Sequence, residues 1–272
     1  MKSLNKNLLF FIGIAAIFYF NREKIQMKCV ELFKQDATFI NHNSEGKANG
    51  KVTIYKAGKV YVIGHVLNGI KQGWEIMYYE NGKIKSKTFF VDGQPSGKGY
   101  LYNNNGKLAY SGYYMDGKPY GGWYNYYDNG HKKKYLLYDI NKKISFSIDY
   151  DIEGNLKLKE MNGLVVSPDF YSINSKNKAV TPLGYQLSAS RVFTDVNDLY
   201  ITVANPEKAR LSITVKINQS QYKFLKVVNS TVKISNAFPE KGKYRILIES
   251  NLYDINNKII NGVNLIDSVI KQ

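Results

Sequence analysis

The sequence predicts a mainly β protein in which an N-terminal apolar helix precedes an antiparallel ladder of β-hairpin repeats and a C-terminal β-sandwich. The chain of 272 residues contains 23 Tyr and 13 Phe but only 6 Pro, and aromatic residues favour strands. Three consecutive blocks of 24 residues align without a gap. Beyond the blocks, apolar and polar residues alternate, which is typical of half-buried strands.

These patterns divide the chain into five parts. The predicted parts are a signal-anchor segment (1–28), a linker (29–42), five hairpin repeats (43–162), a junction (163–190) and a β-sandwich domain (191–272). A chain of this length can hold one to three domains with sizeable cores. Cys29 is its single cysteine, so no intramolecular disulfide can form.

An apolar run lies near the N-terminus. Leu8–Phe20 reads LLFFIGIAAIFYF after Lys2 and Lys6, which is typical of an export signal. A full membrane span needs about 17–25 residues, so flanking residues would have to extend this run. The residues predicted to form the membrane anchor are Leu8, Phe11, Ile14, Ile17 and Phe20. We expect an uncleaved single-pass anchor in the inner membrane, with the bulk of the chain periplasmic or otherwise extracytoplasmic. A cleaved signal and the opposite orientation are the alternatives.

Two kinds of dipeptide recur in the central repeats (67–90, 91–114 and 115–138), and both are typical of hairpin turns. The first kind is Asn81-Gly82, Asn105-Gly106 and Asn129-Gly130, and the second is Asn68-Gly69, Asp92-Gly93 and Asp116-Gly117. We expect type I′ turns, which need positive φ at both central residues, at the first kind. Gly73, Gly97 and Gly121 also recur, which predicts a bend or a close backbone approach.

Sixteen of the 23 tyrosines lie in residues 43–162. Rings at a fixed repeat position can stack on their counterparts one unit away, so we expect most of them to hold the sheet together. The alternative is that one face exposes a strip of aromatic and lysine side chains that binds a ligand. The candidates for this binding surface are Trp74, Tyr78, Tyr102, Trp123, Tyr126, Lys132, Lys133 and Lys134.

The pattern of the repeats resembles a known family. Asn68-Gly69, Gly73, Tyr78 and Asn81-Gly82-Lys83 follow the spacing of the MORN-repeat variant found in many bacterial proteins. The resemblance covers residues 43–162, and the three central repeats carry it best. It implies a non-enzymatic β-hairpin array that contacts proteins or membranes. Some bacterial relatives are labelled antitoxins, which implies an immunity-type alternative.

The C-terminal region carries the alternating pattern of short strands. The predicted strands are Leu199–Ala204, Leu211–Ile217, Tyr222–Val228, Thr231–Ile234, Tyr244–Ser250 and Val263–Ile270. Five or six such strands over this length favour a β-sandwich. The segment FPEKGKYRI, which includes Phe238 and Tyr244, resembles the corner before the sixth strand of an immunoglobulin-like domain, where a Tyr closes a turn. We therefore expect an immunoglobulin-like sandwich.

The sequence contains no motif of an active site. HExxH, G-x-S-x-G, P-loop and Rossmann glycine patterns are missing, and His42, His65 and His131 stand in unrelated contexts. We therefore expect no catalytic residue, no cofactor and no metal. The net charge of +16 is spread along the chain, which predicts attraction to anionic surfaces or to an acidic partner. The alternative is that a lysine-rich surface simply keeps the protein soluble. Without a nucleic-acid-binding module, the sequence disfavours nucleic acid as that partner.

The sequence thus predicts a non-catalytic, membrane-anchored scaffold of a bacterial cell-envelope assembly. Other envelope or membrane proteins would bind its repeat and sandwich surfaces, and anionic lipid or glycan are further candidate partners. One alternative is a carbohydrate or cell-wall binder that uses exposed rings. Another is an antitoxin or immunity-type binding protein.

Overall fold

The computed structural model describes residues 22–24, 26–32, 34–167, 172–173, 179–180, 191–193, 198–223 and 225–271. It confirms that the protein is mainly β and that its antiparallel sheets include a long ladder of hairpins. The chain divides into two compact units. The first comprises residues 1–94 and 104–106, and the second comprises residues 95–103 and 107–272. The predicted boundary near residue 163 therefore lies inside the second unit.

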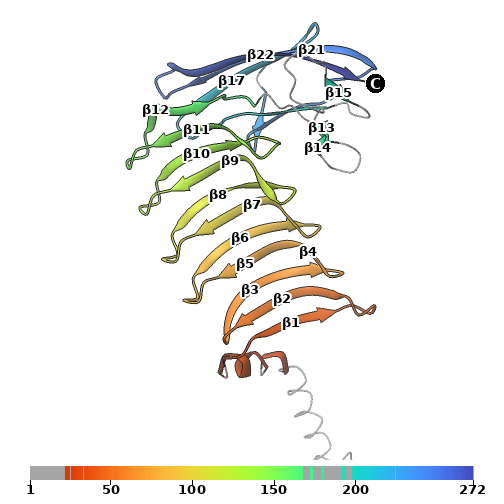
Figure 1. The fold of residues 1–272 in the computed structure, drawn as a ribbon, viewed down its shortest axis with the longest axis vertical. Coiled ribbons are helices and arrows are strands. Elements are labelled where there is room, and N and C mark those ends of the chain that lie inside the picture. The colour runs from red at the N-terminus through yellow and green to blue at the C-terminus, as the bar shows by residue number, and fades with distance from the viewer. Residues whose placement is uncertain are drawn as a thin grey trace, which may run out of the picture. The chain divides into compact units, whose positions relative to one another are not determined.

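The described part of the first unit is built on an antiparallel sheet (Figure 1). Its strands are β1 (Ala37–His42), β2 (Ala48–Lys56), β3 (Lys59–Leu67), β4 (Ile70–Lys71), β5 (Gly73–Tyr78) and β6 (Ile84–Val91). The strand order is β1-β2-β3-β5-β6, with β4 paired to β3, because tight turns join consecutive antiparallel strands. Every residue of β5 is half-buried, and Ser86 is the buried residue of β6. Both faces of these strands therefore keep their side chains partly exposed.

The second unit begins with six strands that follow the same 24-residue repeat (Figure 1). They are β7 (Gln94–Tyr102), β8 (Leu108–Met115), β9 (Lys118–Tyr126), β10 (Lys132–Tyr138), β11 (Ile144–Tyr150) and β12 (Leu156–Gly163). Each strand pairs antiparallel with the next one along the chain. The hairpin predicted for residues 139–162 is therefore present as β11 and β12.

The two kinds of turn differ in their backbone conformation. Both central residues have positive φ at Asn68-Gly69, Asp92-Gly93 and Asp116-Gly117, as a type I′ turn requires. At Asn81-Gly82 and its repeats the glycine alone has positive φ, and the following strand pairing shifts by one residue. The prediction of type I′ turns at Asn81-Gly82 and its repeats is therefore wrong. Each of these turns ends in a β-bulge, which needs only one residue with a left-handed backbone. Gly73, Gly97 and Gly121 all have positive φ, which explains their recurrence.

Hydrogen bonds link several of the turns to a neighbouring repeat. The amide N–H groups of Gly69, Gly93 and Gly117 donate to carbonyls of the preceding repeat at 2.7–3.0 Å. At the other edge, the Asn81 side chain donates to the Asn104 backbone oxygen at 2.9 Å. Asn129 occupies the same repeat position and donates to the Ile152 carbonyl at 3.2 Å. These bonds satisfy turn groups that the strand ladder leaves unpaired.

The described residues in the C-terminal part of the second unit form two further sheets and a small hairpin. The hairpin is β13 (Ser172–Ile173) with β14 (Ala179–Val180); the other strands are β15 (Arg191–Phe193), β16 (Leu199–Thr202), β17 (Arg210–Ile217), β18 (Ser220–Tyr222), β19 (Val227–Val228), β20 (Thr231–Ile234), β21 (Gly242–Tyr253) and β22 (Ile259–Lys271). One sheet has the order β15-β22-β21-β17-β18 and the other has the order β16-β20-β19. Below, residues 198–271 are called the C-terminal module.

One hydrophobic core joins the last repeats to the C-terminal module. From β10 and β11 it includes the buried side chains of Tyr135, Leu137, Phe146, Ile148 and Tyr150. From the C-terminal module it includes Leu199, Ile201, Val215, Val232, Phe238, Ile246 and Ile248, among others. The last two hairpins and the C-terminal module therefore fold as one body, whose stability depends on both.

The N-terminal helix differs from the prediction. Residues 22–24 and 26–32 are helical, and this short stretch carries the charged residues Arg22, Glu23, Lys24, Lys28 and Glu31. Within the described residues, no helix has both the length and the apolar composition that a membrane span requires. The prediction of a single-pass anchor in the inner membrane is therefore corrected. The apolar run itself, with Leu8, Phe11, Ile14, Ile17 and Phe20, lies outside the described residues.

Candidate binding surface of the repeat ladder

One repeat position presents a tyrosine in four successive units. Tyr78, Tyr102, Tyr126 and Tyr150 are spaced by 24 residues, each at the end of the first strand of its hairpin. We call the face that bears this position the tyrosine face. Tyr78, Tyr102 and Tyr126 are half-exposed, whereas Tyr150 is buried. Partial burial, together with the nearby Tyr100, raises the pKa of the Tyr102 hydroxyl.

Trp74 lies on the same face of β5 as Tyr78, because alternate residues of a strand point the same way. Its ring packs edge-on against Phe89, with 5.3 Å between the centroids. The ammonium of Lys87 lies 4.6 Å from the centroid of the indole ring. The structure therefore brings two of the predicted binding residues, Trp74 and Tyr78, together on a half-exposed face.

Trp123 does not belong to an exposed surface. Its side chain is 5% exposed, and it lies on the opposite face of β9 from Tyr126. Its indole N–H donates to the Tyr113 carbonyl at 2.8 Å, and its ring packs edge-on against Tyr114 at 5.0 Å. The ring lies over Gly112, which leaves room for it. The predicted role of Trp123 as an exposed binding residue is therefore wrong.

The three consecutive lysines do not form one basic patch. Lys132 pairs with Glu207 and lies 4.7 Å above the Tyr124 ring, and burial lowers the pKa of its ammonium. Lys134 pairs with Asp149 at 2.8 Å. A register shift between Lys132 and Lys134 turns the two side chains to opposite faces. Lys133 is exposed, with its ammonium 5.7 Å from the Tyr127 ring.

In the last repeats the C-terminal module covers the tyrosine face. The Tyr150 hydroxyl donates to the Glu207 carbonyl at 3.0 Å, and the Tyr124 hydroxyl accepts from the Glu207 amide N–H at 3.0 Å. Tyr135 is 1% exposed, and its hydroxyl lies 3.1 Å from the Ser230 hydroxyl, with which it forms a hydrogen bond. The same hydroxyl accepts a hydrogen bond from the backbone N–H of Asn205 at 3.1 Å. Buried hydroxyls need such partners, so these tyrosines fix the module on the sheet.

Tyr120 makes a similar contact with two threonine side chains of the C-terminal module. Its hydroxyl lies 2.7 Å from the Thr231 hydroxyl and 3.1 Å from the Thr202 hydroxyl. Tyr120, Tyr124, Tyr135 and Tyr150 were not among the predicted binding residues. Their positions within the repeat are visible in the sequence, but their partners lie 57 to 111 residues further along the chain, and no pattern predicts them.

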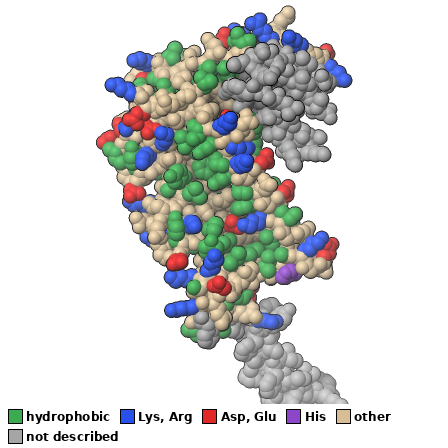
Figure 2. Space-filling view, in the orientation of Figure 1, with side chains coloured by type: hydrophobic (Ala, Val, Ile, Leu, Met, Phe, Trp, Pro, Cys, Tyr) green, Lys and Arg blue, Asp and Glu red, His purple; other side chains and the backbone are tan. Residues whose placement is uncertain are grey.

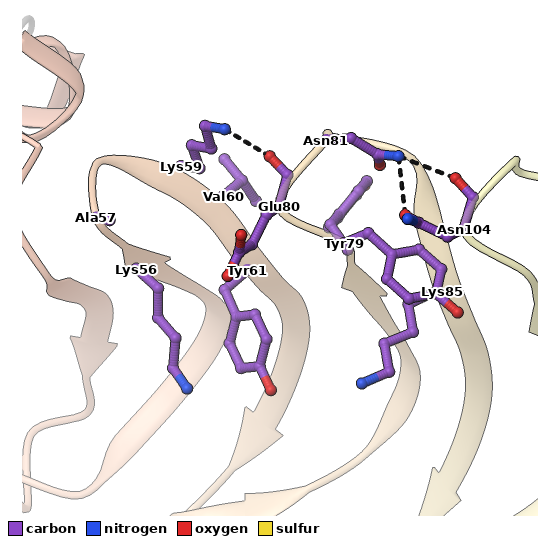
Figure 3. Close-up of a pocket in the computed structure, with 11 residues that line it drawn as sticks. Lys56, Ala57, Lys59, Val60, Tyr61, Tyr79, Glu80, Asn81, Lys85 and Asn104 are labelled. Carbon is purple, nitrogen blue, oxygen red and sulfur yellow. Dashed lines mark hydrogen bonds between the residues drawn. The ribbon is translucent and has the colours of Figure 1, made fainter.

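Hydrophobic side chains also gather on a visible face of the repeat strands, with lysines among them (Figure 2). In the first unit, a hollow of about 660 Å³ opens beside the turns of the hairpins. Its lining comes from strands β2, β3, β5 and β6 and from the turns beside them, and it includes Lys56, Lys59, Tyr61, Tyr78, Tyr79, Glu80, Asn81 and Lys85 (Figure 3). Of these, only Tyr78 was predicted to bind a ligand.

Among the described residues, no group of three or more His, Cys, Asp or Glu side chains could hold a metal ion.

No protein-family model and no curated protein matches this chain. Among solved structures, it is similar to the crystal structure of TarM, with 16% identity and a TM-score of 0.27 over 45% of this chain and 23% of TarM. It is also similar to the extracellular domain of the putative hybrid two-component system BT4673 of B. thetaiotaomicron, with 9% identity and a TM-score of 0.29 over 88% of this chain and 31% of that one. The chain thus spans less than a third of either protein. Likenesses this weak carry no argument about its fold or function.

Proposed function

We propose that this protein is a non-catalytic binding protein that holds a partner protein on the tyrosine face of its hairpin repeats. One observation carries the proposal: in the last repeats, this face already binds the chain's own C-terminal module, which is not built from the 24-residue repeat. Tyr124, Tyr135 and Tyr150 hold that module through backbone groups of its loops and through Ser230. In the earlier repeats, no described residue of the C-terminal module covers the half-exposed Tyr78 and Tyr102 of the same face.

Tyrosine suits this role because its ring contributes apolar contact and its hydroxyl a directed hydrogen bond. Tyr78, Tyr102 and Tyr126 stand at the repeat position of Tyr150 and are half-exposed. Trp74 adds a second large ring beside Tyr78. Tyrosine and tryptophan are the residues that most often dominate the binding energy of protein interfaces. The earlier repeats therefore offer a partner protein the same tyrosine rings and hydroxyls with which the last repeats hold the C-terminal module.

The charge of the chain favours an acidic partner. The net charge is +16, and lysine ammonium groups lie against the rings of the first unit, as Lys87 does on Trp74 and Lys71 on Phe90. Complementary charge accelerates association and selects among partners. We therefore expect added salt to slow association, since salt screens exposed charges. Scaffold and immunity-type roles both require a docked protein, and the identity of the partner distinguishes them.

We also propose that the C-terminal module is an immunoglobulin-like sandwich, which would present a second protein-binding surface. Its two strand orders support this proposal. The order β22-β21-β17-β18 corresponds to strands G, F, C and C′, and the order β16-β20-β19 corresponds to B, E and D. The Tyr244 hydroxyl donates to the Glu240 carbonyl at 2.8 Å, as the tyrosine corner of such domains does.

Site-specific photo-crosslinking tests the proposed binding face. A benzoylphenylalanine residue at Tyr102 should crosslink one predominant protein when the full chain is irradiated in cells. The partner identified in this way, once purified, should bind the purified chain directly. Tyr102→Ala should weaken that binding about tenfold, as expected when an interface loses an anchoring ring. Mass spectrometry of the adduct and calorimetry on the purified pair provide the two measurements.

Tyr110 is the matched control for the crosslinker. It is also a partly exposed tyrosine of the second unit, with 44% of its side chain exposed. Its strand position pairs with Leu101, so it points to the face opposite Tyr102. A crosslinker at Tyr110 should not capture the same protein. Equal capture from both positions, or no predominant adduct from Tyr102, would disprove binding on the tyrosine face.

A further inference from the structure

The hollow in the first unit combines rings and ammonium groups in one place. The ammonium of Lys56 lies 4.2 Å from the centroid of the Tyr61 ring, and that of Lys85 lies 5.8 Å from the Tyr79 ring. The side chains of Lys56, Tyr61 and Lys85 extend in the same direction (Figure 3). Each tyrosine ring therefore has a lysine ammonium group over it, and the two lysine–tyrosine pairs line the same hollow.

Hydrogen bonds between turns fix the rim of this hollow. The Lys59 ammonium donates to the Glu80 carbonyl at 2.7 Å. The Asn81 side chain donates to the backbone and side-chain oxygens of Asn104, both at 2.9 Å. The lining thus contains three ammonium groups and the single carboxylate of Glu80. The local charge is therefore positive, and hydrogen bonds between the turns of three hairpins hold the rim in place.

We propose that this hollow binds one sugar residue that carries an acidic group, either a carboxylate or a phosphate. The rings of Tyr61 and Tyr79 would contact the apolar face of the sugar ring, and tyrosine supplies such contact at a low entropic cost. Lys56 and Lys85 would pair with the acidic group. Glu80 would accept hydrogen bonds from sugar hydroxyls. The volume of about 660 Å³ lies within the range usual for small-molecule sites.

The sugar needs no partner protein, so its binding can be measured on the purified chain alone, although Tyr78 of the tyrosine face also lines the hollow. The hollow also differs from a general basic surface. Lys133 and Tyr127 stand at the repeat positions of Lys85 and Tyr79, and their ammonium-to-ring distance is 5.7 Å. That pair does not line the hollow. A ligand that only needs a lysine beside a tyrosine would bind both pairs, whereas the proposed sugar needs the hollow.

Calorimetric titration of the purified full chain with four probes tests the proposal. The probes are glucose 6-phosphate, glucuronate, glucose and inorganic phosphate. We expect the two acidic sugars to bind at least about tenfold more tightly than either glucose or phosphate, because only they engage rings and ammonium groups together. Lys56→Ala with Lys85→Ala should abolish this preference. Both side chains are exposed, so the variant should remain folded, which its thermal unfolding verifies.

Lys133→Ala is the control, and it should leave the binding of all four probes unchanged. Four outcomes would overturn the proposal. They are phosphate binding as tightly as glucose 6-phosphate, glucose binding as tightly as the acidic sugars, no heat with any probe, and equal losses in Lys133→Ala and the double variant. Each of these outcomes leaves the crosslinking result at Tyr102 unaffected, so the two proposals can fail separately.

Discussion

Replacing Tyr135 by alanine should lower the free energy of unfolding of the second unit by about 3–5 kcal/mol, the range for removing a buried aromatic side chain. Tyr135 is 1% exposed and lies in the core that joins the last repeats to the C-terminal module. Its loss leaves a cavity between them. It also leaves the buried hydroxyl of Ser230 without the partner that Tyr135 provides. Urea unfolding of the full chain, followed by circular dichroism, measures the change.

Tyr135→Phe separates the hydroxyl from the ring. This variant keeps the packing and loses the hydrogen bonds to Ser230 and Asn205, so it should cost about 1–2 kcal/mol. Tyr110→Phe is the control. Tyr110 is 44% exposed, and a change at such a surface position should stay within about 0.5 kcal/mol. A Tyr135→Ala variant as stable as the wild type would show that repeats and module do not share a core.

The same side chain predicts a loss of stability at alkaline pH. Burial raises the pKa of Tyr135 from its ordinary value of 10.0 to about 12. The folded state therefore keeps the proton longer than the unfolded state does. The stability from this group is fully present below pH 10 and decreases as the pH rises from about 10 to about 12. The decrease should be smaller in Tyr135→Phe, which has no hydroxyl to ionise there. Urea midpoints at several alkaline pH values check this.

The repeat ladder could be predicted because its signals are local. Glycine at fixed spacing reports positive φ, and the structure has it at Gly73, Gly97 and Gly121. The kind of turn was harder to predict. Asn81-Gly82 and Asn68-Gly69 read alike in sequence, but the first precedes a register shift and the second closes a two-residue turn. Which of them is the tight turn depends on the register of the flanking strands, which the dipeptide does not determine.

The candidate site could be predicted only in part, because burial in a ladder depends on distant residues. Tyr135 and Tyr110 both lie in aromatic strands of the repeats, yet one is in the core and the other is exposed. The difference comes from the C-terminal module, which covers one face of the last repeats. The lysines and tyrosines of the hollow lie on different hairpins, and no single repeat contains the set. A pattern read one repeat at a time therefore could not find them.

Gly112→Ala should destabilise the second unit by about 1–3 kcal/mol, the usual cost of overfilling a packed site. A Cβ atom at Gly112 would overlap the indole ring of Trp123. That ring is 5% exposed and held by its N–H bond to Tyr113, so it cannot move without losing packing. Urea unfolding gives the free energy. The chain has two tryptophans, and in a proton–nitrogen NMR spectrum the indole signal of Trp123 should shift while that of Trp74 stays.

Gly64→Ala is the matched control, because Gly64 stands at the same position two repeats earlier. The three atoms nearest to a Cβ there all belong to the Glu75 side chain, and the closest lies at an ordinary contact distance of 3.6 Å. Thr88, between them in the repeat series, already carries a side chain. We therefore expect Gly64→Ala to be neutral or slightly stabilising, since alanine restricts the unfolded chain. Equal losses at Gly64 and Gly112 would mean that the repeat backbone itself requires glycine. A loss at Gly112 alone would show that the neighbouring ring determines which residue this position accepts.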